Sequence, residues 1–491
     1  MTHSYHIFYF PFRWDITGVR LRTLSERIDL KRIHYKSHSE WIHTQNPMSD
    51  SEAADLYNEK NYYYRFVHNI LYDEPGNKLN LIRHYERKEP QESTNVRYLI
   101  KVTNRQQPYE LKVDAMNINL YSTGVGFLSF YLKNERDDQQ APDDILKINQ
   151  YGRRIMPPFY ADIKYRNETS EYIAIQGLFP SNEYQEDFKD YEPTDSWKPA
   201  SFIRTLIMEL ADNIEIAPII DDRLFVICWY KNDKLAAHFT EHPQAYCDVN
   251  DDFSAFWYKF LFIDGTDETC QNDTMKTELL KRHTYLRWQK WTSLYGVSRY
   301  SFVYLTNSTV PAYLLSYVQT IYARMVELVL AQRASMLRFS GEVTNVSNLS
   351  HQNVDEISSL ISSLYKEYIR FMNQIYFREV TAQDQGIELY DLLHSCLKME
   401  TYIKDLDDEI EELHQYVSLK EDRSRNKKAS VLNDIATLFL PLTVITGFFG
   451  MNLWEDIFDK ETPNGLFWKT FILLVGFICA LIVIRNRNKK L

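Results

Sequence analysis

NDIATLFLPLTVITGFFGMN, residues 433–452, makes up most of the first of two long apolar runs near the C-terminus and the few residues that follow it. The first run covers residues 429–449 and the second covers residues 466–484. Each run is close to the roughly 20 residues that a helix needs to cross about 30 Å of hydrocarbon. The pattern predicts a C-terminal two-helix transmembrane hairpin, with residues 450–465 as the connector.

Basic residues on both flanks predict the orientation of this hairpin. They precede the first run and follow the second, and they are Arg423, Arg425, Lys427, Lys428, Arg485, Arg487, Lys489 and Lys490. Because basic flanks stay in the cytoplasm, a two-pass protein with cytoplasmic N- and C-termini is expected. Residues 1–428 and the basic tail, 485–491, are then cytosolic. A signal peptide is not expected, since Arg13, Asp15 and Arg20 interrupt the aromatic N-terminal run.

The composition is that of a mostly water-exposed chain with an acidic surface. A quarter of the residues are charged, and 56 basic against 67 acidic residues give a net charge of -11. This balance argues against direct nucleic-acid binding and favours attraction of cations. The five cysteines form no CxxC pair, so we expect them to be reduced and no structural zinc site to exist.

The cytosolic part changes character at about residue 310. Before it, short aromatic and β-branched runs alternate with polar breaks, which predicts an α/β or α+β domain over residues 1–310. The predicted strands are 7–12, 98–102, 116–121, 126–132 and 224–230, with a helix at 201–211. After it, residues 311–428 show long helical patterns, at 312–339, at 355–377 and from Ile387 onward.

A heptad seam marks the last of these helices. Its apolar residues recur at spacings of three and four and are Leu389, Leu392, Cys396, Met399, Ile403, Leu406, Ile410, Leu413 and Val417. No Pro or Gly separates Ile387 from the first apolar run, so one stalk helix is expected to continue into the membrane. A seam of this kind favours packing on neighbouring copies over packing within one subunit.

Polar residues inside the first run also favour an assembly. Asn433, Asp434, Thr437, Thr443 and Thr446 would be costly to expose to lipid, so several should face water or a partner helix. Two helices cannot enclose a pore alone. A ring of copies can, with the first run lining the axis and the second facing lipid.

Residues 433–452 resemble the first membrane helix and Gly-Met-Asn signature of the CorA-type magnesium channel family. The resemblance covers residues 387–491 and rests on the Pro-Leu-Thr of the span, the tripeptide Gly450-Met451-Asn452, the second span and the basic tail. It implies a homopentameric funnel in the bacterial inner membrane that conducts Mg²⁺, and Co²⁺ or Ni²⁺ as further cargo. No cofactor is implied other than Mg²⁺ as the transported, and in family members also regulatory, ion.

By position, the resemblance carries over a filter and a pore lining. Gly450, Met451 and Asn452 would form the selectivity filter, in which a ring of Asn452 amide oxygens binds hydrated Mg²⁺. Asn426, Leu432, Leu440 and Thr443 would line the pore, with the two leucines as apolar gates. Other interpretations stay open: Gly450 and Asn452 could cap the helix, and Leu440 could be interhelical packing.

Three features leave the mechanism open. Phe449 stands where the family commonly has Tyr, and Asp434 stands where it has an apolar residue; we favour Asp434 paired with a neighbour over an acidic ring in the pore. The stalk acids, Asp405, Asp407, Asp408, Glu411 and Glu412, are candidates for a regulatory metal site, but a solvated helix face is the commoner role for such a run. The regulatory site is therefore unassigned.

Two other functions compete with a magnesium channel. CorA-like proteins encoded beside type III CRISPR systems are thought to be membrane effectors in antiviral defence, switched by a nucleotide second messenger; here Tyr62, Tyr63 or Tyr64 could stack on a base, although core packing is the more frequent role of such a residue. A zinc transporter of the same superfamily is the other alternative. An enzyme is not expected, because no Walker, nucleophile-elbow or HExxH motif occurs and Thr123-Gly124-Val125-Gly126 is interpreted as a turn.

Overall fold

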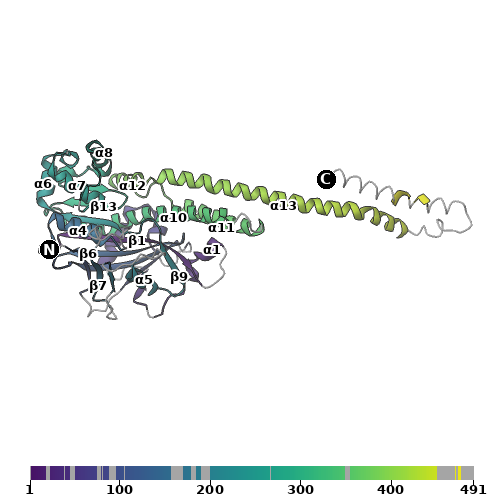
Figure 1. Cartoon of the computed structure of the whole chain (residues 1–491), viewed down its shortest axis with the longest axis horizontal. Coiled ribbons are helices and arrows are strands. Elements are labelled where there is room, and N and C mark those ends of the chain that lie inside the picture. Colours follow the sequence, from purple (N-terminus) through teal and green to yellow (C-terminus); the bar gives the residue numbers. More distant parts are fainter. Residues whose placement is uncertain are drawn as a thin grey trace, which may run out of the picture. The chain divides into compact units, whose positions relative to one another are not determined.

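The computed structural model describes most of residues 2–450 and a few residues beyond them (Figure 1). The described residues are 2–17, 23–37, 39–44, 50–73, 79, 81–87, 95–103, 105–155, 170–178, 184–188, 200–265, 267–348, 354–450, 470–471 and 474–476. They divide into two compact units, one of residues 1–351 and 359–412 and one of residues 352–358 and 413–491. Each unit is described by itself.

The first unit is built on one large mixed sheet. Within the described residues it has 13 strands, in the order β11-β12-β13-β10-β1-β6-β5-β4-β7-β8, with β9 beside β1 and with β3 and β2 beside β5. The strands are β1 (Ser4–Ile16), β2 (Trp41–His43), β3 (Ile82–Arg87), β4 (Arg97–Lys101), β5 (Tyr109–Tyr121), β6 (Val125–Asn134), β7 (Tyr172–Gln176), β8 (Tyr184–Asp187), β9 (Ile214–Pro218), β10 (Phe225–Lys231), β11 (Thr284–Tyr285), β12 (Leu294–Val297) and β13 (Ser301–Thr306). The β10 and β13 pair is parallel, and the other described pairs are antiparallel. Of the two predicted classes, this sheet fits α+β.

Helices cover the sheet and extend beyond it. The longer ones are α2 (Asp50–Tyr62), α4 (Pro142–Gly152), α5 (Ser201–Met208), α6 (Asp233–Glu241), α7 (Asp252–Phe262), α8 (Asp273–His283), α10 (Ala323–Asn348), α11 (Val354–Gln374), α12 (Asp384–Cys396) and α13 (Met399–Gly450). The shorter ones are α1 (Leu24–Arg27), α3 (His68–Leu71), α9 (Tyr313–Tyr317) and η7 (Val318–Tyr322), a single turn of π-helix between α9 and α10, together with the 3₁₀ turns η1 (Leu30–Arg32), η2 (Arg65–Val67), η3 (Asp137–Gln139), η5 (Ala245–Cys247) and η6 (Gln289–Trp291).

Strand β1 lies in the middle of the sheet because almost its whole length can be buried. Its residues are aromatic or β-branched on both faces, and Ile7, Phe8, Tyr9 and Phe10 are fully buried. It pairs with β6 from Ser4 to Arg13 and with β10 on its other side. A strand buried on both faces reads as a continuous apolar run, as this one does.

Helix α10 packs on β1 and β6 and is fixed there by a buried arginine. Arg338 donates to the carbonyl oxygens of Trp14 (3.0 Å) and Gly124 (2.8 Å) and to the Asp15 carboxylate (2.6 Å). Gly124 has φ +76, and a Cβ there would lie 2.8 Å from the Arg338 guanidinium carbon. The predicted turn at Thr123-Gly124-Val125-Gly126 is therefore confirmed, and its glycine also makes room for this anchor.

The predicted strands and long helices correspond to β1, β4, β5, β6, β10, α5, α10 and α11. The stalk differs from the prediction: instead of one helix from Ile387 onward there are two, because Lys398 adopts φ +54 between α12 and α13. A left-handed residue cannot continue a right-handed helix. Because neither Pro nor Gly is present at the break, sequence pattern alone could not predict it.

The heptad seam is occupied within the chain, contrary to the expectation that neighbouring copies would cover it. Cys396, Met399, Leu406, Ile410 and Val417 are all buried in this single chain. Leu406 shares a small cavity with Met336 and Leu337 of α10. The stretch from Leu389 to Val417 is thus chiefly an internal packing surface, and the argument for self-association from this seam does not hold.

Among the described residues, the helical run Tyr313–Ser347 is the one that is long and apolar enough to cross a membrane, with a mean hydropathy of 1.2. Most of it, 61% of its most apolar window, is buried inside the chain. Since α10 packs on the sheet, core packing accounts for this hydropathy. The predicted spans fall elsewhere: residues 429–449 are helical within α13, whereas residues 466–484 lie mostly outside the described residues.

Candidate functional site

The predicted pore-lining residues lie on the second half of α13. On a helix of 3.6 residues per turn, Asn426, Leu432, Leu440 and Thr443 fall within an arc of about 120°. The side chains of Leu432 and Leu440 are 67% and 64% exposed in the single chain. A shared face is a geometric requirement for lining a pore, and these four positions meet it.

Exposed apolar side chains surround these positions. Val431, Ile435 and Phe439 are 57%, 48% and 55% exposed. An isolated water-soluble helix rarely presents so many large apolar groups in ten residues, because each leaves apolar area in water. The second half of α13 therefore has a surface that needs lipid or other helices to cover it.

Hydroxyl groups on this helix are satisfied locally. Thr437 donates to the carbonyl oxygen of Asn433 at 2.7 Å, and Thr443 donates to those of Phe439 (3.1 Å) and Leu440 (2.9 Å). Backbone bonds of this kind allow Thr in an apolar setting. Asp434 is exposed and lies about 140° around the helix from the centre of the predicted lining arc.

The predicted filter is only partly within the described residues. Gly450 is the last described residue of α13. Met451 and Asn452 lie outside the described residues, so their role stays a prediction.

The stalk acids do not gather into a metal site. Among the described residues there is no group of three or more His, Cys, Asp or Glu side chains that could hold a metal ion. Asp405, Asp408 and Glu412 are exposed, and Asp407 accepts a hydrogen bond from Tyr368 at 2.9 Å. Within one chain, these residues have the character of a solvated helix face.

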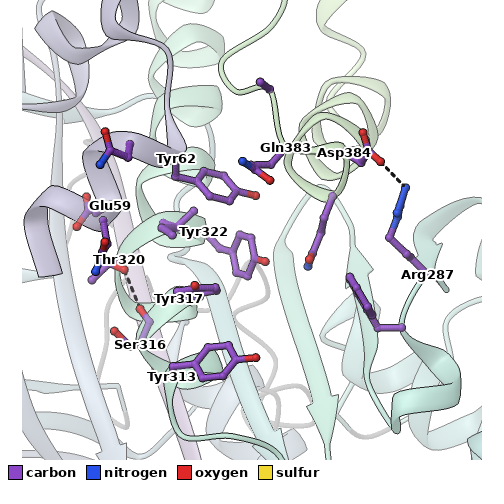
Figure 2. A pocket seen from close by; sticks show the side chains of 16 residues that line it. Glu59, Tyr62, Arg287, Tyr313, Ser316, Tyr317, Thr320, Tyr322, Gln383 and Asp384 are labelled. Atoms are coloured by element: carbon purple, nitrogen blue, oxygen red, sulfur yellow. Dashed lines mark hydrogen bonds and ion pairs between the residues drawn. The ribbon is translucent and has the colours of Figure 1, made fainter.

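A cavity of about 920 Å³ in the sheet unit is a second candidate site, and it was not found from the sequence (Figure 2). It lies between the C-terminal end of α2, the segment before η6, the α9–η7 segment and the N-terminal end of α12. Its volume is near the upper end of ordinary ligand pockets, roughly 300–1,000 Å³. Its aromatic lining residues are Tyr62, Trp288, Tyr313, Tyr317 and Tyr322.

Four tyrosines form one wall of this cavity. Figure 2 shows Tyr62, Tyr322, Tyr317 and Tyr313 one above another, across from Gln383, Asp384 and Arg287. The rings of Tyr313 and Tyr317 are 5.4 Å apart. Burial, followed by the nearby Tyr317 phenol, raises the pKa of Tyr62, so this hydroxyl stays neutral at physiological pH.

The π-turn explains how Tyr322 joins this wall. In an α-helix, residues 317 and 322 would point about 140° apart. A π-turn bonds residue i to i+5 and so brings such residues onto one side. Periodicity that assumes 3.6 residues per turn could not have predicted this, whereas the i,i+4 spacing of Tyr313 and Tyr317 is visible in the sequence.

The facing wall is polar and already neutralised. Arg287 forms hydrogen bonds of 2.8 and 2.7 Å with Glu388 and lies 3.5 Å from Asp384. Glu59, at the tyrosine side, is ion-paired with Arg324 and accepts from Tyr72 at 3.0 Å. Of the described residues that line the cavity, Arg287 is thus the one cation, and two carboxylates share it.

The three tyrosines singled out from the sequence have different environments. Tyr62 lines the cavity, whereas Tyr63 is buried and donates to the carbonyl oxygen of Ile321. Tyr64 stacks on Phe66 at 5.3 Å and donates to Glu379 at 2.7 Å. Only Tyr62 is therefore placed to meet a ligand in this cavity, and core packing is the role of Tyr63.

Comparison with known proteins gives one result. Residues 303–485 match the family model described as CorA-like Mg²⁺ transporter protein. The match includes α10 to α13, both predicted spans and part of the tyrosine wall. Neither the curated proteins nor the solved structures gave a significant match.

Proposed function

We propose that this chain is a Mg²⁺ channel. Residues 303–485 belong to the CorA-like Mg²⁺ transporter family, which makes the chain a membrane protein of a divalent cation transporter superfamily. Copies of the chain would assemble as a homopentamer in the bacterial inner membrane. The second half of α13 would line the pore, and Asn452 would bind the hydrated ion at its outer mouth. The proposed function moves the ion across the membrane without a chemical reaction, so the chain would not be an enzyme.

The observation that carries this proposal is the exposed apolar surface on the second half of α13. This half bears exposed apolar residues such as Leu432, Ile435 and Leu440, and the predicted lining positions share one face. Membrane burial would remove this apolar area from water at about 25 cal/mol per Å². A ring of such helices would then place the Leu432 and Leu440 side chains at an apolar constriction.

Mg²⁺ is the preferred cargo because of the residues expected at the filter. Mg²⁺ loses its water reluctantly and is commonly recognised with that water in place. Amide oxygens can accept hydrogen bonds from the hydrated ion without stripping it. Co²⁺ and Ni²⁺ are further candidates, and zinc transport within the same superfamily remains the alternative cargo.

Flux into liposomes tests this proposal. The full-length protein would be reconstituted at low internal Mg²⁺, and uptake would be followed with a Mg²⁺-sensitive dye. We expect Asn452→Ala to reduce uptake at least about tenfold, because the ring of amide oxygens is lost. Zn²⁺ uptake under the same conditions would identify the alternative cargo.

The matched control is Asn464→Ala, the same change within the same predicted connector. It should leave uptake unchanged, which excludes a general effect of removing an amide from the loop. Equal uptake by Asn452→Ala and the wild type would refute the filter assignment. Both variants would first be checked for the oligomeric state of the wild type.

A second candidate function is a pore opened by a cytosolic ligand, and the tyrosine-lined cavity favours it. A nucleotide second messenger in antiviral defence is one such ligand. In this case the wild-type protein would be silent in the flux experiment until the ligand is added. Silence of a well-folded oligomer, followed by opening on addition of a nucleotide, would support it.

A further inference from the structure

The tyrosine-lined cavity combines features that restrict the chemistry of its ligand. Its aromatic wall consists of Tyr62, Tyr313, Tyr317 and Tyr322, with Trp288 also lining the space. Amide side chains, those of Asn58, Asn61, Gln383 and Gln385, supply both hydrogen-bond donors and acceptors. Flat aromatic faces with amides at the edge suit a planar ring that carries nitrogen and oxygen atoms.

The charge of the lining argues against a polyphosphate. Phosphate groups are usually held by several Lys or Arg side chains or by a free helix N-terminus. Here Arg287 is bonded to Glu388 and close to Asp384. The N-terminal turn of α12, which could attract an anion, carries Asp384 itself. A multiply charged anion would meet these carboxylates without a free cation among the described lining residues.

The same lining suits a ring that is uncharged or positively charged. Tyrosine faces attract cations through the negative potential of the ring. Three carboxylates, of Glu59, Asp384 and Glu388, are shared between the two guanidinium groups of Arg287 and Arg324, so the ionic groups of the lining and their partners carry one excess negative charge. Burial raises the pKa of Tyr62 and of Tyr322, so these two phenols are neutral at physiological pH and do not repel the electrons of a ring beside them.

The π-turn η7 is an independent sign that this wall is built for a ligand. Such turns are rare and occur frequently at functional sites. In this chain the turn places Tyr322 beside Tyr317. Tyr317 is 37% exposed and Tyr313 is 56% exposed, so two rings of the wall remain open to solvent and are not needed for the core.

We propose that this cavity is a binding site for a planar nitrogen heterocycle that is uncharged or cationic where it enters the site, such as a nucleoside without a polyphosphate. The ring lies against Tyr317 and Tyr313, and the amides of Asn58 and Gln383 contact its edge. This inference rests on the proposed ligand control of the pore and specifies the chemistry of that ligand. Its binding step can be measured apart from conduction.

The cavity is also placed to affect the long helices. Its wall at η7 continues directly into α10, and its wall at Gln383–Gln385 is the start of α12. Helix α12 leads through Lys398 into α13. A ligand that contacts both walls would fix the start of α12 relative to the start of α10, both within the sheet unit.

Calorimetric titration of the full-length protein in detergent tests the ligand class. The probes are the four common ribonucleosides, nicotinamide riboside as a cationic ring, and adenosine triphosphate as an anionic counterpart of adenosine. We expect at least one uncharged or cationic probe to bind, and adenosine triphosphate to bind at least about tenfold more weakly than adenosine. Tyr317→Leu should weaken binding of the best probe by about tenfold.

The matched control is Tyr416→Leu, since Tyr416 is 47% exposed on α13 and does not line the cavity. It should bind as the wild type does. Tyr317 is partly exposed, so its loss should not unfold the chain, and an unchanged melting temperature would verify this. Tyr313→Leu provides a second variant with the same expected effect.

Three results would overturn the inference: no binding of any uncharged or cationic probe up to millimolar concentration, tighter binding of adenosine triphosphate than of adenosine, or unchanged binding by Tyr317→Leu and Tyr313→Leu. The Asn452→Ala protein separates this inference from the proposed channel. It should lose uptake but keep probe binding, so failure of one proposal is distinguishable from failure of the other.

Discussion

Asp221 and Asp222 show how two neighbouring carboxylates in the sheet unit can make the charged form of one of them unfavourable, which composition does not reveal. They lie between β9 and β10 and share Arg223, whose Nε is 3.1 Å from Asp221 and 3.4 Å from Asp222. Burial, followed by a hydrogen bond with Asp221 and the negative charge of that residue, raises the pKa of Asp222 to about 6. Two carboxylates at one site cannot both ionise without cost.

This pair gives a prediction about pH. Because the folded-state pKa of Asp222 exceeds its unfolded value, its contribution to stability is full below about pH 4 and is lost as the pH rises through about 6. Asp222→Asn should therefore raise the free energy of unfolding at pH 7.5 by about 1–2 kcal/mol and have little effect at pH 4. Urea unfolding of the full-length protein in detergent, followed by tryptophan fluorescence, measures both values.

Asp267→Asn is the control for this prediction, since Asp267 is exposed. Its effect should be within about 0.5 kcal/mol at either pH, as for most surface substitutions. A loss of stability in Asp222→Asn at pH 7.5 would show that the carboxylate of Asp222 stabilises the fold when charged, contrary to the argument from burial.

At the scale of elements, the break between α12 and α13 depends on one residue. Lys398 has φ +54, a conformation that costs a residue with a Cβ about 1–2 kcal/mol and glycine far less. Lys398→Gly should raise the stability of the full-length protein by up to about 1 kcal/mol, and Lys398→Val should lower it. Thermal unfolding by circular dichroism compares the two variants.

Lys404→Gly tests the same replacement within the interior of α13. Lys404 is exposed, and glycine there should cost about 1 kcal/mol. Opposite effects of glycine at positions 398 and 404 would verify that the break is left-handed. A destabilised Lys398→Gly would indicate that the helices continue through this point.

Sequence pattern correctly predicted the elements whose buried residues can be recognised within a single stretch of sequence. The two-sided apolar run at 7–12 became β1, and the helical run at 312–339 became α9 to α10, because side-chain burial alone selects these structures. Strand β13 was missed because its parallel partner β10 is distant in sequence, whereas β12 is only four residues long and pairs with the adjacent β13. The cavity was missed for a similar reason: it joins residues near 62, 288, 317 and 383, and Tyr322 reaches it only through a π-turn.

At the scale of the whole molecule, the apolar second half of α13 requires something outside the single chain. This half of α13 lies within residues 303–485, which match the CorA-like Mg²⁺ transporter family model, and we propose that it lines a pore. The seam before it, up to Val417, is already covered. Contacts between copies are therefore expected after Val417 rather than along the whole stalk.

Cysteine cross-linking tests this assembly. On the predicted lining face, Leu440→Cys should form a disulfide between copies under mild oxidation, because five such residues converge on the axis. Asp434→Cys, which lies about 120° around the helix from Leu440, should cross-link at least about tenfold less in the same membranes. The wild type controls for its own cysteines, and native mass spectrometry of the reduced protein should give five chains.

The central place of β1 has a consequence for how the chain is made. This aromatic strand is synthesised well before its partners, since β6 starts at Val125 and β10 starts at Phe225. At roughly 5–20 residues per second, β10 emerges on the order of 10–40 s after β1. During that interval the aromatic residues of β1 are unpaired and exposed to other nascent chains. We therefore expect a holding chaperone to bind this strand well before the predicted spans are synthesised.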